Sequence, residues 1–282
     1  MHRRRHGRRG ALRGGVRLGG GRSEVGRRRF AVVALAALVA ASAPAAAQTE
    51  FHFQFGELLN PFSAQEEESF VLTLQQATQW KYGDSFFFID YLDDRGRDGL
   101  NERDFYGEWY PTLSLGKMTG KTVGGGPLVD VGFIAGLNAA GDAKVVKYLP
   151  GLRLAWKASG FIFLNTDLML YVDDSSGVGA GGAPKTDDSY CFDVNWLYLF
   201  SVGEQSFQIT GHAEYIGAVT NEFGVESGGT ILAQPQFRWD AGKAFGGDAG
   251  KLFAGIEYQY WSNKLGTEED ESAVQLLLAW QL

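Results

Sequence analysis

The residues in this chain that could do chemistry are aromatic rings and carboxylates placed two positions apart. In the stretch 83–92, Asp84, Phe86, Phe88 and Asp90 share one parity. Aromatic rings stack on flat, partly apolar molecules, and carboxylates accept hydrogen bonds from hydroxyl groups. We interpret this pattern as a set of weak binding sites for a flat, hydroxyl-bearing solute.

Other kinds of chemistry have little support in the sequence. Cys191 is the single cysteine, so no disulfide can form within the chain and no Cys/His cluster indicates zinc. Serine hydrolysis needs a histidine paired with a serine and a supporting Asn or Asp, and beyond residue 47 the sequence has only His52 and His212. One such arrangement needs a serine two positions after the histidine, where His212 has Glu214. We therefore expect no enzyme, no metal site and no cofactor.

The candidate binding residues must be positioned by strands, because apolar and polar residues alternate along most of the chain. Phe51, Phe53 and Phe55 alternate with His52 and Gln54, which is the period of a strand with one apolar face. The predicted strands are 50–57, 67–79, 83–92, 104–115, 127–137, 145–156, 160–172, 188–200, 205–217, 229–240, 251–262 and 272–282.

Twelve such strands predict an all-β fold, a transmembrane antiparallel β-barrel in the bacterial outer membrane with both termini in the periplasm. The apolar face of each strand would meet lipid and the polar face would line the lumen. Placing Asp84 and Asp90 in lipid would be costly, so we assign their face to the lumen. The further lumen candidates are Tyr106, Glu108, Tyr110, Arg153, Phe161, Phe163, Asp167, His212, Glu214, Arg238 and Glu257.

The two ends of the chain carry targeting information. Residues 1–47 have the pattern of an export signal, with arginines before a short apolar stretch and Ala45, Ala46 and Ala47 before the cleavage point. This leaves 48–282 as one barrel domain. The last strand is apolar at every second position and ends at Leu282, which resembles the signal read by the outer-membrane insertion machinery.

The charge of the domain argues against some partners. Without the eleven Arg and one Glu of the first 47 residues, 15 basic and 32 acidic residues remain, a net charge of −17. Such a surface repels nucleic acid, so we expect no nucleic-acid partner. It should also make nucleotides poorer substrates than neutral nucleosides.

The connections between strands should alternate in length, with long outer loops and short periplasmic turns. Acidic outer loops are explained by solvation, and bridging by divalent cations to lipopolysaccharide is the alternative. The long connections are 58–66, 93–103, 173–187, 218–228 and 263–271, the short ones are 80–82, 157–159 and 201–204, and the exceptions are the long turns 116–126 and 241–250 and the short loop 138–144.

Five stretches resemble the nucleoside-specific channel-forming outer-membrane porins, the Tsx-type family with its vibrio phage-receptor relatives. They are 51–56, 81–90, 108–117, 234–240 and 255–264. The resemblance implies a monomeric twelve-stranded barrel that binds nucleosides in series in a narrow lumen. It carries nucleoside-binding roles over to Asp84, Phe86, Phe88, Asp90, Glu108, Tyr110, Arg238 and Glu257.

Three functions are compared on these grounds. The favoured one is a channel for passive, selective diffusion of nucleosides or similar small solutes. The alternative is a nonselective porin or a structural barrel with a surface-receptor role, in which the inward rings only fill space. An outer-membrane enzyme is the third, and the histidine context given above argues against it.

Overall fold

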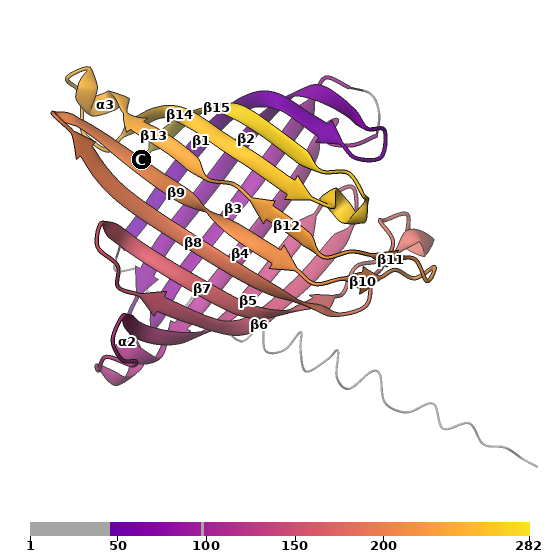
Figure 1. Cartoon of the computed structure of the whole chain (residues 1–282), viewed down its shortest axis with the longest axis horizontal. Helices are drawn as coiled ribbons and strands as arrows, with labels where there is room; N and C mark the ends of the chain where they lie inside the picture. The colour runs from indigo at the N-terminus through magenta and orange to yellow at the C-terminus, as the bar shows by residue number, and fades with distance from the viewer. Residues whose placement is uncertain (1–45, 97–98) are drawn as a thin grey trace, which may run out of the picture.

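Strands produced by the alternating pattern close on themselves into a barrel (Figure 1). The structure is a computed structural model that describes residues 46–96 and 99–282. The predicted export signal, 1–47, lies almost wholly outside the described residues. Its last two residues are described and belong to the first strand. Among the described residues, no helix has the length and apolar character needed to cross a bilayer.

The elements follow one another as hairpins around the barrel. Their bounds are β1 (Ala46–Asn60), β2 (Gln65–Trp80), β3 (Gly83–Asp94), β4 (Asp104–Ser114), α2 (Leu115–Thr119), β5 (Leu128–Ala140), β6 (Val145–Trp156), β7 (Phe161–Asp173), η1 (Val178–Ala180), β8 (Ser189–Val202), β9 (Gln205–Ile216), β10 (Val219–Thr220), β11 (Glu226–Ser227), β12 (Thr230–Ala233), β13 (Gln236–Asp240), α3 (Ala241–Ala244), β14 (Leu252–Ser262), η2 (Lys264–Gly266) and β15 (Glu271–Gln281).

The first and last strands pair with each other and close the sheet. β1 and β15 run antiparallel, with Glu50 opposite Gln281 and Phe55 opposite Leu276. Closure leaves no strand edge whose N–H and C=O groups lack a neighbour, which is the condition for a sheet to cross a lipid bilayer. The predicted antiparallel barrel of twelve strands is therefore confirmed.

The tenth strand of the barrel is interrupted, so it is divided into β12 and β13. Gln234 and Pro235 lie at the break, and Pro235 has no N–H to donate to a neighbouring strand. Gly211 on the facing strand has a φ of +140°, and a Cβ there would lie 2.3 Å from the Gln234 carbonyl oxygen. Glycine is thus required where the two backbones approach, and the strand stays in register across the break.

The connections differ from the prediction mainly in the first hairpin. The predicted long loop 58–66 is a turn of only 61–64, because β1 and β2 remain paired from Leu58–Glu67 to Asn60–Gln65. Leu58 packs inside the barrel against Val71 and Ala273, which stabilises this extension. At the end of the barrel that carries the termini, 115–127 and 241–251 are long, and each begins with a short helix.

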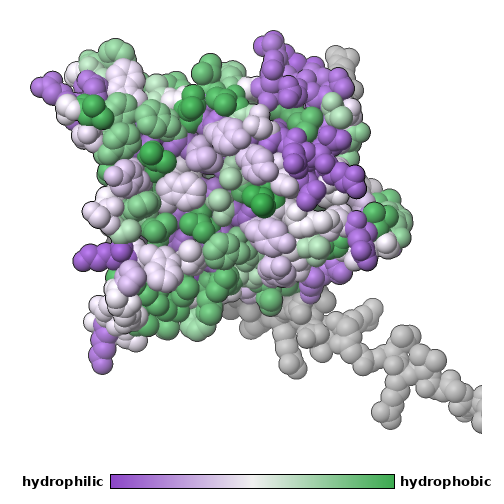
Figure 2. All heavy atoms as spheres, viewed as in Figure 1, coloured by the Kyte–Doolittle hydropathy of each residue, from purple (hydrophilic) through white to green (hydrophobic). Residues whose placement is uncertain are grey.

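The outer face of the barrel is apolar, as a lipid-facing surface requires. Figure 2 shows hydrophilic residues gathered at the upper right, where the β1–β2 turn of Figure 1 lies, and apolar residues spread over the strands. This belt around a closed sheet places the chain in the bacterial outer membrane. Exposed side chains of the belt include Phe105, Phe133, Leu168, Leu170, Phe192, Ile256, Leu276, Leu278 and Trp280.

We expect Leu276→Arg to lower the free energy of unfolding of the barrel by about 2–4 kcal/mol, the cost of an arginine near the bilayer midplane. Leu276 is 67% exposed at the centre of β15. The matched control is Leu282→Arg, which lies at the end of the same strand and should cost about 0–1 kcal/mol. Urea titration of the barrel in lipid vesicles measures both values, and equal costs would contradict a lipid-facing β15.

Candidate functional site

The site is the polar face of the strands, which turns into the barrel. Side chains on this face contact one another across the interior, whereas their sequence neighbours are exposed outside. The structure brings most of the predicted residues together there. Those that contact other inward groups are Asp84, Phe86, Phe88, Asp90, Tyr106, Glu108, Tyr110, Arg153, Asp167, His212, Glu214, Arg238 and Glu257.

Arg153 on β6 joins two acidic residues from different parts of the wall. Its Nε and Nη2 atoms donate to the two carboxylate oxygens of Asp167 at 2.8 and 2.7 Å. Its Nη1 atom lies 3.3 Å from Asp84 Oδ1 on β3. This forked geometry holds the guanidinium flat and fixes its place, while Asp84 stays partly accessible from the lumen.

Arg238 on β13 is the centre of a second, more deeply buried group. Its Nη1 atom lies 3.0 Å from Glu50 Oε2, and His52 Nε2 lies 2.9 Å from that same oxygen. Arg238 also donates to Gln236 Oε1, and Gln236 donates to Glu257 Oε2 at 2.5 Å. Sequence reasoning did not name Glu50 or His52 as site residues. The signal was present, because they alternate with three phenylalanines on the first strand.

A third group surrounds Glu108 on β4. Tyr106 donates its hydroxyl hydrogen to Glu108 Oε1 at 2.5 Å, and Asn138 Nδ2 donates to the same oxygen at 2.9 Å. Tyr110 donates to Asn138 Oδ1 at 3.0 Å. The carboxylate is buried, so these donors replace the water it would otherwise bind.

Three aromatic rings form a strip along β3 and β4, which we call the ring strip. The Phe86 and Phe88 centroids are 6.2 Å apart, and the Phe88 and Tyr106 centroids are 6.0 Å apart. All three residues are half-buried, so part of each remains accessible. Thr73 donates to Asp90 Oδ1 at 2.5 Å at the end of this strip.

Phe161 is a correction to the predicted lumen residues. The pairing of β7 with β8 shifts between Phe161 and Phe163, and this irregularity turns Phe161 to the outer face. There its ring packs against Tyr198, with centroids 5.1 Å apart, next to Phe200. Phe163 lies opposite Leu197 and keeps the inward parity, near the end of the strand. A register shift of this kind leaves no mark in the hydrophobic pattern.

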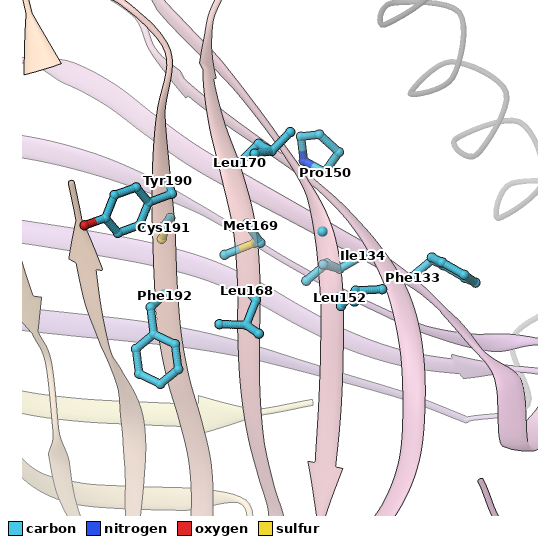
Figure 3. Close-up of a pocket in the computed structure, with 11 residues that line it drawn as sticks. Phe133, Ile134, Pro150, Leu152, Leu168, Met169, Leu170, Tyr190, Cys191 and Phe192 are labelled. Carbon is cyan, nitrogen blue, oxygen red and sulfur yellow. The ribbon is translucent and has the colours of Figure 1, made fainter. Parts of the chain in front are cut away.

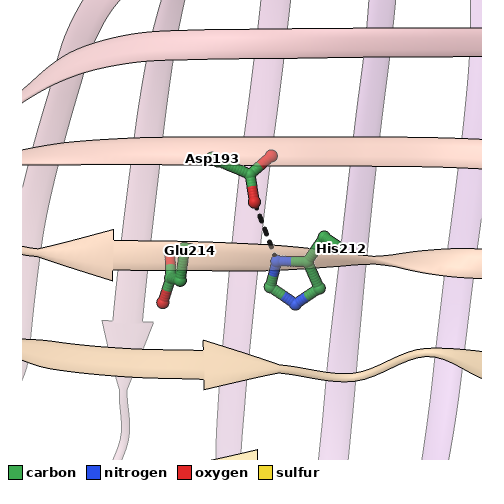
Figure 4. Close-up of side chains that lie close together, drawn as sticks. All are labelled: Asp193, His212 and Glu214. Carbon is green, nitrogen blue, oxygen red and sulfur yellow. Dashed lines mark hydrogen bonds and ion pairs between the residues drawn. The ribbon is translucent and has the colours of Figure 1, made fainter.

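His212 on β9 lies between two hydrogen-bond partners. Its Nδ1 atom is 3.0 Å from Asp193 Oδ1, the contact drawn in Figure 4, and its Nε2 atom is 3.0 Å from Gln234 Oε1. Asp193, His212 and Glu214 each offer one ligand atom, and these atoms all lie within 4.8 Å of one another. Among the residues that the structure describes, this is the group that could hold a metal. The grouping could not be predicted from the sequence, because Asp193 lies on β8 whereas His212 and Glu214 lie on β9.

The partners of His212 also bear on the enzymatic alternative. Within the described ranges, its hydrogen bonds run to Asp193 and Gln234, and neither side chain carries the hydroxyl or thiol that a histidine activates in serine or cysteine hydrolases. Cys191 is buried, and its thiol lies 3.6 Å from Glu214 Oε2. The arrangement therefore shows no serine–histidine pair of the hydrolase type.

Two lysines anchor chain segments at the mouth opposite the termini. Lys147 Nζ lies 3.0 Å from Asp173 Oδ2 and donates to Thr186 Oγ1 at 2.9 Å, which ties the segment 174–188 to the inner wall. Lys264 Nζ donates to the Leu59 carbonyl oxygen at 2.6 Å and to Glu271 Oε1 at 2.8 Å. Burial lowers the pKa of Lys264, and the Glu271 carboxylate acts in the opposite direction.

An open groove of about 750 Å³ lies on the outer face of β5 to β8 (Figure 3). Its lining is apolar and includes Pro150, Leu152, Leu168 and Tyr190, with Gly151 between them. Because this face lies in lipid, we assign the groove to acyl chains and not to the path of a solute.

Of the comparisons with known proteins, only the one with solved structures finds matches. No protein-family model matches the sequence, and the comparison with curated proteins finds no relative. The predicted membership of the nucleoside-channel family is therefore not confirmed. Solved structures with a similar fold include a KdgM porin (TM-score 0.47, 7% identity, 83% of this chain and 99% of that chain), a NanC porin (0.48, 10%, 84% and 100%) and OccK10 (OpdN) of Pseudomonas aeruginosa (0.33, 9%, 84% and 98%).

We expect Arg238→Leu to lower the free energy of unfolding by about 3–5 kcal/mol, because it leaves the buried Glu50 carboxylate without its partner. The matched control is Arg95→Ala, which breaks an ion pair with Glu68 whose side chains are 82% and 67% exposed. That change should cost about 0–1 kcal/mol. Denaturant titration measures both, and a small effect of Arg238→Leu would show that the buried group does not stabilise the barrel.

Proposed function

We propose that the barrel is a channel for passive diffusion of small solutes across the outer membrane, with nucleosides as the favoured class. The observation that carries this proposal is the ring strip. Phe86, Phe88 and Tyr106 are half-buried and keep part of their surface accessible inside a closed wall, whereas the neighbouring carboxylate of Glu108 is buried and held by donors. Accessible rings in a water-filled interior are costly unless a ligand covers them.

The chemistry of this surface suits a base joined to a sugar. A nucleobase can stack on Phe86 or Phe88, and such stacking contributes about 1–3 kcal/mol per base. The sugar hydroxyls can donate to Asp84, which is accessible, and to Asp90 at the other end of the two rings. Several weak contacts in a row allow a solute to enter and also to leave, as conduction requires.

The resemblance noted in the sequence supports the same class of solute. The stretch 81–90 is among those that resemble the nucleoside channels, and it contributes Asp84, Phe86, Phe88 and Asp90 to one face of β3. Glu108 and Arg238, two further residues carried over by the resemblance, also lie in the interior. Monomeric assembly is part of this proposal.

The buried polar groups favour the second candidate, a barrel with a filled interior and no solute preference. Glu50, Arg238 and Asp167 are almost fully buried in ion pairs, which is how narrow barrels fill their lumen. In that case the rings of the ring strip fill space in the interior and bind no solute. The two candidates make opposite predictions for substitutions in the strip.

We expect replacement of both Phe86 and Phe88 by alanine to weaken nucleoside block of the single-channel current by about tenfold or more, because stacking is lost. Ion conductance in the absence of nucleoside should stay similar or rise. Planar-bilayer recordings of the purified barrel, titrated with adenosine, thymidine and glucose, measure this effect.

The matched control for that experiment is Phe87→Ala. Phe87 lies between the two rings in sequence, opposite Trp109, and faces lipid. Its replacement should leave block unchanged. Equal block in the wild type and the double variant would show that the ring strip only packs, and absence of block by any nucleoside in the wild type would favour the filled or nonselective barrel.

We expect the open channel to prefer cations over anions, because residues 48–282 carry 32 acidic and 15 basic residues and the inward Asp84 is partly accessible. The reversal potential in a KCl gradient reports this preference. Asp84→Asn removes an accessible inward charge and should reduce it, whereas Asp142→Asn, in an exposed loop, should not. Anion preference in the wild type would contradict the proposed path along Asp84.

A further inference from the structure

The group formed by Asp193, His212 and Glu214 has the layout of a metal site. Asp193 on β8 is directly opposite Glu214 on β9, and His212 precedes Glu214 by two positions on the same face. Their ligand atoms lie within 4.8 Å of one another (Figure 4). A tetrahedral ion bound at about 2.0–2.2 Å needs ligand atoms roughly 3.5 Å apart. Binding of such an ion therefore requires the side chains to rotate so that these atoms move closer together.

The hydrogen bonds of His212 leave one ring nitrogen directed at this group. Gln234 donates its amide hydrogen to Gln259 Oε1 at 2.9 Å, so its own Oε1 atom faces His212 as an acceptor. His212 Nε2 therefore carries the hydrogen in that contact. In the neutral ring the Nδ1 lone pair then faces the Asp193 carboxylate, and two acceptors at 3.0 Å need a cation or a proton between them. A second-sphere amide that fixes the tautomer is usual for ligating histidines.

Glu214 provides an independent observation that points to a cation. Its residue is 7% exposed, so its carboxylate is buried in the wall. Among the described residues, its one hydrogen bond comes from the Cys191 thiol at 3.6 Å. The buried arginine and lysine side chains of the described residues are paired with other carboxylates: Arg153 with Asp84 and Asp167, Arg238 with Glu50, Lys147 with Asp173 and Lys264 with Glu271. A buried carboxylate without a cation is costly, and a bound dication would offset that cost.

The donor set selects the kind of ion. An imidazole and two carboxylates, with a thiol beside Glu214, are typical ligands of zinc and other borderline transition metals. Magnesium and calcium prefer sets made of oxygen alone. We propose that Asp193, His212 and Glu214 bind a transition-metal dication such as Zn²⁺ in the lumen.

A metal ion bound at this site should change the movement of ions through the proposed channel. The His212 side chain is 25% exposed, so the group is reachable from the lumen. A dication held there adds two positive charges to a path lined by carboxylates. In the channel proposed above, it should therefore lower the current carried by cations. This second step rests on the proposed function, whereas binding of the ion does not.

Binding is tested first by titrating the purified wild-type barrel in detergent with ZnCl₂ in a calorimeter. We expect about one Zn²⁺ per barrel with micromolar affinity and no comparable binding of Mg²⁺. His212→Gln and Glu214→Gln should each weaken Zn²⁺ binding by at least about tenfold. The matched control is Glu204→Gln, at the exposed turn between the same two strands, which should bind like the wild type.

Two outcomes would overturn the site. One is no Zn²⁺ binding by the folded wild-type barrel, and the other is binding of equal affinity in folded His212→Gln and Glu214→Gln. The effect on passage is measured separately, as reversible block of the single-channel current by Zn²⁺ that EDTA relieves. Calorimetric binding without block would retain the metal site and count against its position in the conducting path.

Discussion

Pairing of β1 with β15 is the interaction on which the rest of the structure depends. It turns a long sheet into a closed wall, so that each strand has a neighbour on both sides. Only then can backbone polar groups cross a bilayer without water. Closure also fixes the two environments of every strand, because period-two alternation sends one set of side chains to lipid and the other to the interior.

The interior follows from this constraint through charge and packing. Polar residues that turn inward are buried there, so their hydrogen-bonding groups and charges must be paired with one another. Arg238 with Glu50 and Arg153 with Asp167 do this by ion pairs, and Glu108 does it with neutral donors. The partly accessible inward side chains include the rings of Phe86 and Phe88 and the carboxylate of Asp84. Together with the buried ion pairs, these partly accessible side chains are the basis of the proposal that the interior binds flat solutes weakly.

Much of the fold could be predicted from the sequence, since alternation is a strong signal where one face meets lipid. The strand bounds of β3 and β6 agree closely with the predicted 83–92 and 145–156. The site was less accessible to prediction, because its contacts join strands far apart in sequence. Asp193 has the inward parity of its strand, but its contact with His212 was not predicted, because alternation gives the face of a residue and not its partner on the next strand. Phe161 was misplaced because a register shift reverses its face without changing the pattern.

The flux of labelled solutes into sealed vesicles is the most direct test of a lumen that is both open and selective. Vesicles containing the purified barrel should take up adenosine faster than glucose, and adenosine uptake should saturate as its concentration rises. Protein-free vesicles give the background rate. Adenosine uptake at the background rate would contradict an open lumen, and equal, non-saturating uptake of adenosine and glucose would contradict selection by the rings of β3.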